Sequence, residues 1–113
     1  MERNFVIHQN KTFWGKVWHI ITSDGKGHIR VQHDNEDPGY AYISSLSVIP
    51  EVRRKGLATE LLKRAEQVTG VNVFRLNVEK VAPKWILEFY ERKGYEIYLE
   101  DDDYYYLEKD ESR

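Results

Sequence analysis

Three consecutive cations, Arg53, Arg54 and Lys55, stand directly before Gly56 and the start of a helix-like pattern. A helix start leaves backbone N–H groups without intrahelical partners and carries about half a positive charge. Phosphate groups bind readily at such a place, and a glycine lets the main chain come close because it has no Cβ. The segment therefore predicts a site for a multiply charged anion.

The elements around this segment would place the anion site at one edge of a sheet. Residues 57–68 carry apolar side chains at helical spacing, and Gly70 ends the pattern. Residues 41–48 read as a strand before this helix, and residues 71–78 as a strand after it. Strand, helix and strand in this order predict a right-handed parallel crossover. Open sheets with such crossovers usually bind ligands at the carboxyl ends of the strands.

The first of these strands has an irregular apolar pattern. Ile43 stands at an odd-numbered position, whereas Leu46 and Val48 stand at even-numbered ones. A strict period of two would therefore place Ile43 on the opposite face of the strand from Leu46 and Val48. One interpretation is a β-bulge around Ser44 and Ser45, which would leave backbone groups unpaired just ahead of the anion site. The alternative is a central strand buried on both faces, in which parity carries no information.

Residues 83–94 form a second predicted helix. A proline suits its first turn, a glycine closes it, and its apolar stripe includes Phe89 and Tyr90. From the pattern alone, Tyr90 is either a core aromatic with its hydroxyl at the surface or a functional phenol. The remaining predicted strands are residues 4–8, 16–22, 28–32, 95–99 and 104–107.

These residues resemble the GCN5-related N-acetyltransferase (GNAT) family. Its acetyl-coenzyme A loop has Arg or Gln, two residues, Gly, one residue, then Gly or Ala, after a Val-x-Pro strand end. Residues 53–58 match the loop, and residues 48–50 match the strand end. The second signature, Tyr-x-x-x-Gly followed by Phe or Tyr, is matched from Tyr90 to Tyr95. The resemblance covers roughly residues 41–100 and implies the acyl-CoA N-acyltransferase fold, which is of the α+β class. That fold has αβα layers and a mixed, mostly antiparallel sheet of six or seven strands with one parallel β-α-β crossover. The length of 113 residues predicts that residues 1–113 form one domain.

The resemblance also implies acetyl-CoA as cosubstrate and direct transfer of its acetyl group to a primary amine. The acceptor would be a small molecule or a peptide or protein lysine. Backbone N–H groups of residues 54–59 would bind the pyrophosphate, and the pantetheine arm would pair with the strand edge at residues 46–48. The implied coenzyme-binding residues are Leu46, Ser47, Val48, Arg53, Arg54, Lys55, Gly56, Leu57, Ala58 and Thr59.

Three residues are implied in catalysis by the same resemblance. The N–H of Val48 would donate to the thioester carbonyl as it becomes an oxyanion, and Tyr90 would protonate the departing thiolate. Many family members place a glutamate base on the strand before the Val-x-Pro, where this chain has Tyr42 and Ser44. Glu79 is the nearest carboxylate that might substitute through a water, or solvent might serve as the base. A non-catalytic acyl-CoA-binding module of the same fold is therefore the alternative function.

Composition argues against several other functions. The chain has no cysteine, which excludes disulfides, thiolate metal sites and a covalent cysteine intermediate. His8, His19, His28 and His33 have no short metal-ligand spacing, so no metal is expected. No segment approaches the length of a membrane span and the N-terminus lacks a signal-peptide core, so we expect a cytoplasmic protein without a membrane partner. The net charge of −2 argues against a nucleic-acid partner.

Two features concern the acceptor side. Residues 100–113 are strongly acidic, which would suit a cationic amine acceptor or would simply be a solvated end. Family members usually carry one or two helices between the first and second strands, where they form part of the acceptor pocket. This chain has only the short Gln9–Gly15 segment there. The acceptor side is therefore expected to be open, or to be completed by another subunit in a homodimer.

Overall fold

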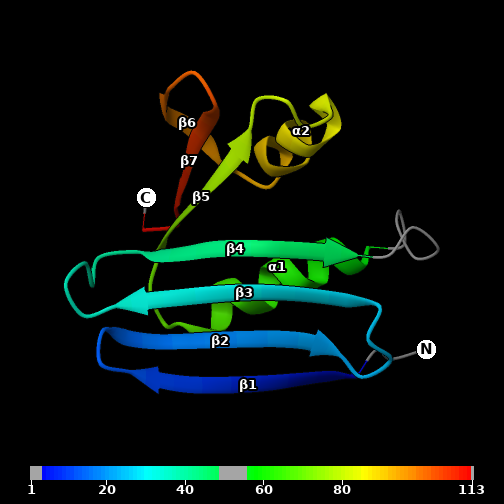
Figure 1. The fold of residues 1–113 in the computed structure, drawn as a ribbon, viewed down its shortest axis with the longest axis vertical. Coiled ribbons are helices and arrows are strands. Elements are labelled where there is room, and N and C mark those ends of the chain that lie inside the picture. Colours follow the sequence, from blue (N-terminus) through cyan, green and yellow to red (C-terminus); the bar gives the residue numbers. More distant parts are fainter. Residues whose placement is uncertain (1–3, 49–55, 113) are drawn as a thin grey trace.

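Seven β-strands form one mixed sheet in the order β1-β2-β3-β4-β5-β7-β6 (Figure 1). The computed structural model describes residues 4–48 and 56–112. The strands are β1 (Phe5–Thr12), β2 (Gly15–Thr22), β3 (Gly27–Asp34), β4 (Ala41–Val48), β5 (Val73–Glu79), β6 (Glu96–Glu100) and β7 (Tyr104–Asp110). Helix α1 (Leu57–Val68) joins β4 to β5, and α2 (Lys84–Arg92) joins β5 to β6. Among the paired strands of this part, β4 and β5 are parallel and the others antiparallel. The predicted α+β fold, with its mostly antiparallel sheet and one β-α-β crossover, is confirmed.

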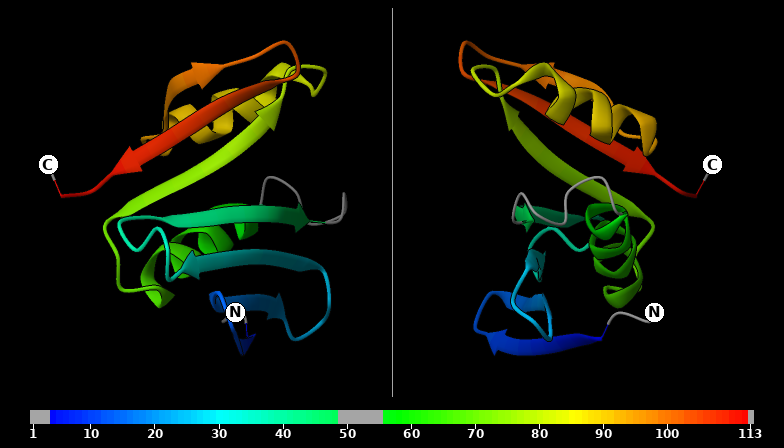
Figure 2. Two further views of the ribbon diagram at one scale, coloured as in Figure 1. Left: turned by 60° about the vertical axis from the view of Figure 1, so that its left-hand side comes forward. Right: turned by 90° about the vertical axis from the view of Figure 1, so that its right-hand side faces the viewer.

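Both helices cover the same face of the sheet. Helix α1 lies behind β3 and β4 in the left view of Figure 2. Its side chains at the predicted apolar positions, such as Leu61 and Ala65, are fully buried in the core. The partly buried side chains of α2, among them Leu87 and Tyr90, pack against the same cluster. Gly27 of β3 allows the close approach of α1, because a Cβ there would lie 2.9 Å from Cδ1 of Leu61. The strand residues of this core are Trp18, Ile20, Ile29, Val31, Ala41, Ile43, Phe74, Leu76, Val78 and Leu107.

The connection between β1 and β2 contains no helix. β1 extends to Thr12 and β2 begins at Gly15, so the Gln9–Gly15 segment is strand and tight turn. The Thr12 hydroxyl oxygen accepts hydrogen bonds from the N–H groups of Trp14 and Gly15, both at 3.2 Å. Because the family's additional helices would occur in this connection, the described residues form two layers instead of the expected αβα arrangement. The face of the sheet opposite α1 and α2 carries no helix of this part of the chain.

β4 is bulged and then separates from β5. Ser45 has a φ of 57°, and the pairing of β3 with β4 shifts register between His28 and Arg30. The bulge interpretation of the irregular apolar pattern is therefore confirmed. β4 and β5 pair only at Ala41↔Phe74 and Tyr42↔Arg75, after which the strands diverge (Figure 1). The later part of β4 thus has a backbone edge that β5 does not cover.

Candidate active site

A cleft of about 920 Å³ lies between the end of β4, the start of α1 and one side of α2. This volume is within the range of about 300–1,000 Å³ that small-molecule sites usually have. The structure brings six of the predicted site residues together in its lining: Leu46, Val48, Gly56, Ala58, Thr59 and Tyr90. The other lining residues come from α2 and the turn before it, and they are Pro83, Trp85, Ile86, Phe89 and Arg92.

The start of α1 presents backbone to this cleft. Gly56 is the N-cap, with a φ of 78°, and among residues 4–48 and 56–112 no side chain caps the first turn. A residue with a Cβ is strained at this φ, which accounts for the glycine. The space beside it is open, since an added Cβ would meet no described heavy atom within 4 Å. Because Gly56, Ala58 and Thr59 line the cleft, the positive end of the helix is available to an anion there.

Tyr90 brings a phenol to the opposite wall of the cleft. Its ring makes edge-to-face contacts with Phe89, at 5.2 Å between centroids, and with Tyr95, at 5.8 Å. Burial raises the pKa of Tyr90 to about 12. The phenol is therefore protonated at neutral pH, so it can donate a proton or a hydrogen bond to a thiolate.

A family model described as the acetyltransferase (GNAT) domain matches residues 4–97 of the chain. The chain belongs to the GNAT family. It is an acetyltransferase domain of the class that takes acetyl-CoA as cosubstrate. No curated protein sequence matches the chain.

Solved structures of acetyltransferases share this fold. The PaiA N-acetyltransferase from Thermoplasma acidophilum, in complex with coenzyme A, aligns with a TM-score of 0.69 and 22% identity, over 83% of this chain and 59% of that one. A proposed acyl-CoA N-acyltransferase from Klebsiella pneumoniae aligns with a TM-score of 0.71 and 15% identity, over 95% of this chain and 97% of that one. N-acetyltransferase PseH from Campylobacter jejuni aligns with a TM-score of 0.65 and 24% identity, over 88% of this chain and 70% of that one. The GNAT domain described here thus spans well under two thirds of PaiA but nearly all of the Klebsiella protein.

Not every predicted residue lines the GNAT cleft. Leu57 is buried in the core, so only its backbone is near the helix start. Ser47 is exposed and does not line the cleft. Arg53, Arg54 and Lys55, the predicted cations of the loop, lie outside the described residues.

The residues considered for a base lie away from Tyr90. Tyr42 and Ser44 alternate with the core residues of β4 and therefore face the uncovered side of the sheet. Ser44 accepts a hydrogen bond from Nη1 of Arg30 at 3.2 Å. Glu79 is exposed at the end of β5 and lines a separate, smaller cavity of about 260 Å³ beside α2. The structure does not bring Glu79 into the cleft.

The sequence interpretation did not assign most of the α2 wall to the site. Trp85, Ile86 and Phe89 belong to the apolar stripe of residues 83–94, and no motif in the sequence marks them further. In the structure no residue of α2 is fully buried, and Trp85 is 57% exposed. The signal for this wall was therefore present in the sequence as helical spacing, but spacing does not say whether an apolar stripe covers a core or lines a ligand site.

A buried polar cluster of Tyr95, Glu66 and Lys109 lies next to Tyr90. Tyr95 is 1% exposed, and its hydroxyl donates to Oε2 of Glu66 in α1 at 2.7 Å. Nζ of Lys109 in β7 lies 3.2 Å from the same oxygen. The N–H of Tyr95 also donates to the carbonyl oxygen of Tyr90 at 3.1 Å. These contacts connect α1, β7 and the end of α2, and so hold the two helical walls of the cleft together.

In residues 4–48 and 56–112, no three His, Asp or Glu side chains are arranged to hold a metal ion. None of the helices in these same residues is long and apolar enough to cross a bilayer.

Proposed function

We propose that this GNAT domain is an N-acetyltransferase that transfers the acetyl group of acetyl-CoA directly to a primary amine within a ternary complex. The observation that supports this most strongly is the cleft in which the start of α1, the bulged end of β4 and Tyr90 meet. Residues 1–113 act as one domain in this proposal. The alignment over 95% of this chain and 97% of the Klebsiella protein supports that view.

The start of α1 would hold the pyrophosphate of the coenzyme. No side chain of the described part of the chain caps its first-turn N–H groups, and the positive end of the helix favours an anion. The side chains of Arg53, Arg54 and Lys55, which precede the helix in the sequence, would add charge-assisted hydrogen bonds.

The uncovered edge of β4 would hold the pantetheine arm. Beyond Tyr42, β5 no longer pairs with this strand, and an extended ligand can add to such an edge as a further strand does. Leu46 and Val48 line the cleft along this edge and would contact the arm. The proposed donor to the thioester oxygen is the backbone N–H of Val48, a type of contact typically worth about 3 kcal/mol in the transition state.

Tyr90 would complete the transfer. The neutral amine nitrogen attacks the thioester carbonyl carbon, a C–N bond forms, and the C–S bond breaks. The phenol of Tyr90 gives its proton to the departing thiolate, while the nitrogen loses a proton to a base. The phenolate of Tyr90 then regains a proton from solvent, and the base releases the one that it took up. Glu79, acting through a water molecule, or solvent itself is the proposed base.

The non-catalytic acyl-CoA-binding module is the second candidate. Its support is specific: positions 42 and 44 lack a carboxylate, and Glu79 lies outside the cleft. A domain that binds the coenzyme without a positioned base would keep the cleft and lose turnover.

The experiment that separates these candidates is a free-thiol release assay with acetyl-CoA. The panel of acceptors should contain small amines, peptide N-termini and lysine peptides. Peptides belong in it because the NatC complex bound to Gag peptide and CoA has a similar fold, with a TM-score of 0.65 and 21% identity. Release of thiol that depends on an amine supports the enzyme, whereas coenzyme binding with no release for any acceptor supports the module.

A further inference from the structure

Five tyrosines gather on the face of the sheet that neither helix covers. Tyr42 of β4 and Tyr104 and Tyr106 of β7 alternate with core residues, so their rings project to the side opposite α1 and α2. Tyr40, just before β4, and Tyr98 of β6 contact the same central side chain, Arg75. We name this surface the tyrosine face, and it consists of Tyr40, Tyr42, Tyr98, Tyr104 and Tyr106.

The tyrosine face is ordered by contacts within the protein. The guanidinium carbon of Arg75 lies 4.3 Å from the ring centroid of Tyr40 and 5.0 Å from that of Tyr98. Nε of Arg75 also pairs with Oε2 of Glu108 at 2.8 Å. The rings of Tyr104 and Tyr106 lie 6.2 Å apart, and the Tyr106 hydroxyl donates to Asp101. Rings held in this way lose little conformational entropy when a partner binds, which is one reason why tyrosine is enriched in binding surfaces.

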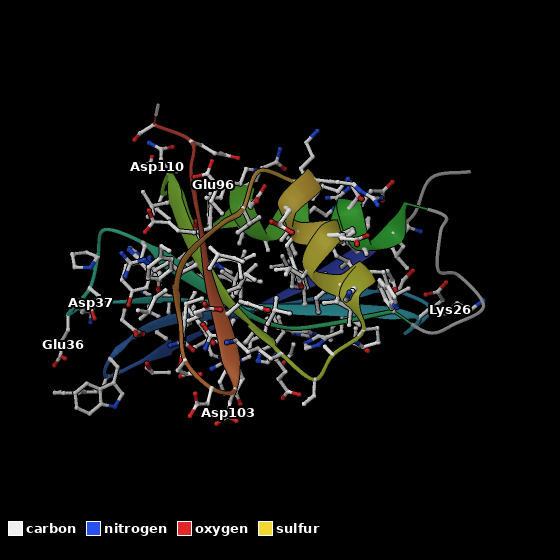
Figure 3. All side chains as sticks on the ribbon, turned by 90° about the horizontal axis from the view of Figure 1, so that it is seen from above. Lys26, Glu36, Asp37, Glu96, Asp103 and Asp110 are labelled. Atoms are coloured by element: carbon white, nitrogen blue, oxygen red, sulfur yellow. The ribbon has the colours of Figure 1, made fainter. Side chains whose placement is uncertain are left out.

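The surroundings of the tyrosine face are negatively charged. The described residues from 96 onward contain eight acidic side chains and one cation, Lys109. That cation lies on the helical side, paired with Glu66, and Arg75 is paired with Glu108. Glu96 and Asp110 stand at one end of the β6–β7 ribbon and Asp103 at the other (Figure 3). Glu100 pairs with Lys80, Glu108 with Arg75 and Glu111 with Lys109, so the eight carboxylates outnumber the cations that pair with them. The face therefore presents aromatic rings in a negative electrostatic field.

The tyrosine face also adjoins the proposed reaction site. Tyr42 and Arg75 form the last pair between β4 and β5, and the two strands diverge from this point toward Leu46 and Val48. A partner on the tyrosine face would therefore lie beside the opening between the strands in which the thioester is proposed to sit.

We propose that the tyrosine face binds the acceptor, and that the acceptor is a basic polypeptide carrying the lysine to be acetylated. This inference rests on the proposed function and narrows its substrate. Cationic side chains complement the carboxylates and stack on tyrosine rings. A polypeptide can contact several of these five rings at once, which a free small amine is too small to do. A second copy of the chain would bring like charges together, which disfavours this face as a homodimer interface.

The test compares acceptors that carry the same reactive group. The probes are a peptide with one lysine flanked by arginines, a peptide of equal length in which glutamates replace the arginines, and Nα-acetyl-lysine amide. The arginine-flanked peptide is expected to have a KM about tenfold lower than either of the other two. Equal KM values for the three acceptors would overturn the inference.

Variants locate the binding surface. Tyr98→Ala is expected to raise the KM for the arginine-flanked peptide about tenfold, as loss of an aromatic interface residue commonly does, without changing kcat. Asp103→Lys, at an exposed position, is expected to raise the same KM, and Tyr98 is itself 48% exposed, so neither change should prevent folding. Phe13→Ala is the matched control, because this aromatic is 86% exposed at the β1–β2 turn. An unchanged KM in both tyrosine-face variants, or an equal increase in the control, would refute the proposal.

Two further readouts separate this inference from the function on which it rests. The rise in melting temperature on adding acetyl-CoA should be the same in Tyr98→Ala and in the unaltered protein. If the coenzyme gives no rise at all, the proposed function fails. If the coenzyme binds and only Nα-acetyl-lysine amide is acetylated well, the proposed function stands and the polypeptide acceptor is wrong. A dimer in sedimentation that Tyr98→Ala dissociates would assign the face to a second copy and would also overturn the proposal.

Discussion

Replacing Tyr90 by phenylalanine removes one hydroxyl from the cleft and little else. The ring contacts with Phe89 and Tyr95, at 5.2 and 5.8 Å, are available to phenylalanine as well. The variant should therefore fold, bind acetyl-CoA as before and show the same rise in melting temperature. Loss of the proton donor should lower kcat about 100-fold, the low end of the range for general acid catalysis, because solvent can still protonate the thiolate. A factor of this size corresponds to about 2.7 kcal/mol of transition-state stabilisation.

The pH dependence of kcat gives a second prediction for the same residue. A phenol with a pKa of about 12 keeps its proton throughout the range in which the enzyme can be assayed. Tyr90 should therefore cause no fall of kcat between about pH 7 and 10, since only about a hundredth of it is ionised even at the upper limit.

The assay is release of free thiol at saturating amine, measured for the unaltered protein, Tyr90→Phe and Tyr105→Phe. Tyr105 is the matched control, because it lines the smaller cavity and not the cleft. If Tyr90→Phe retains the kcat of the unaltered protein, Tyr90 is a wall of the cleft and not a proton donor. An alkaline fall of kcat near pH 8 that disappears in Tyr90→Phe would instead contradict the raised pKa.

Two other predictions concern stability. Glu66→Gln removes the charge that Lys109 pairs with and weakens the acceptor of the Tyr95 hydroxyl, so it should lower the free energy of unfolding in urea by about 1–3 kcal/mol, and an unchanged midpoint would contradict this. Nδ1 of His19 lies 3.1 Å from Nε2 of His28. Desolvation is the largest cause that lowers the pKa of His19, and electrostatic interactions with His28 and Arg30 lower it further. Because folding favours the neutral form of His19, this residue contributes to the free energy of unfolding above pH 6.5. That contribution is lost as the pH falls through the lowered pKa. His19→Gln should therefore flatten the loss of stability between about pH 7 and 5, and an equally steep loss would contradict the assignment.

The parts of the fold that could be predicted are those specified by local pattern. The α1 stripe from Leu57 and the closing glycine at position 94 determine helix ends through spacing and a positive φ, which is 96° at Gly94. The bulge was suggested by the parity change between Ile43 and Leu46, because a period of two is strict wherever one face is buried. The extension of β1 through Gln9 and Thr12 had no such signal, since this is an exposed edge strand with polar residues on both faces.

The site was only partly predictable for a related reason. Gly56, Ala58 and Tyr90 belong to motifs that act locally, and the structure places them in one cleft. Whether Glu79 reaches that cleft depends on how far β5 diverges from β4, which follows from strand pairing over long distances in the chain. The tyrosine face arises in the same way, because it needs β4, β6 and β7 to be neighbours of Arg75. No local pattern contains that information.

The most direct test of the account is the melting temperature with and without acetyl-CoA, for the unaltered protein, Gly56→Val and Gly25→Val. Both glycines have a positive φ, 78° and 75°, and open space around them, so valine should strain both positions to a similar extent, but Gly25 lies in the β2–β3 turn. At a coenzyme concentration of 100 times Kd, binding should stabilise the unaltered protein by about 2.7 kcal/mol, and Gly25→Val by the same amount. Gly56→Val should show no stabilisation by the coenzyme. A full shift in Gly56→Val, or no shift in the unaltered protein, would contradict the claim that the start of α1 binds the pyrophosphate.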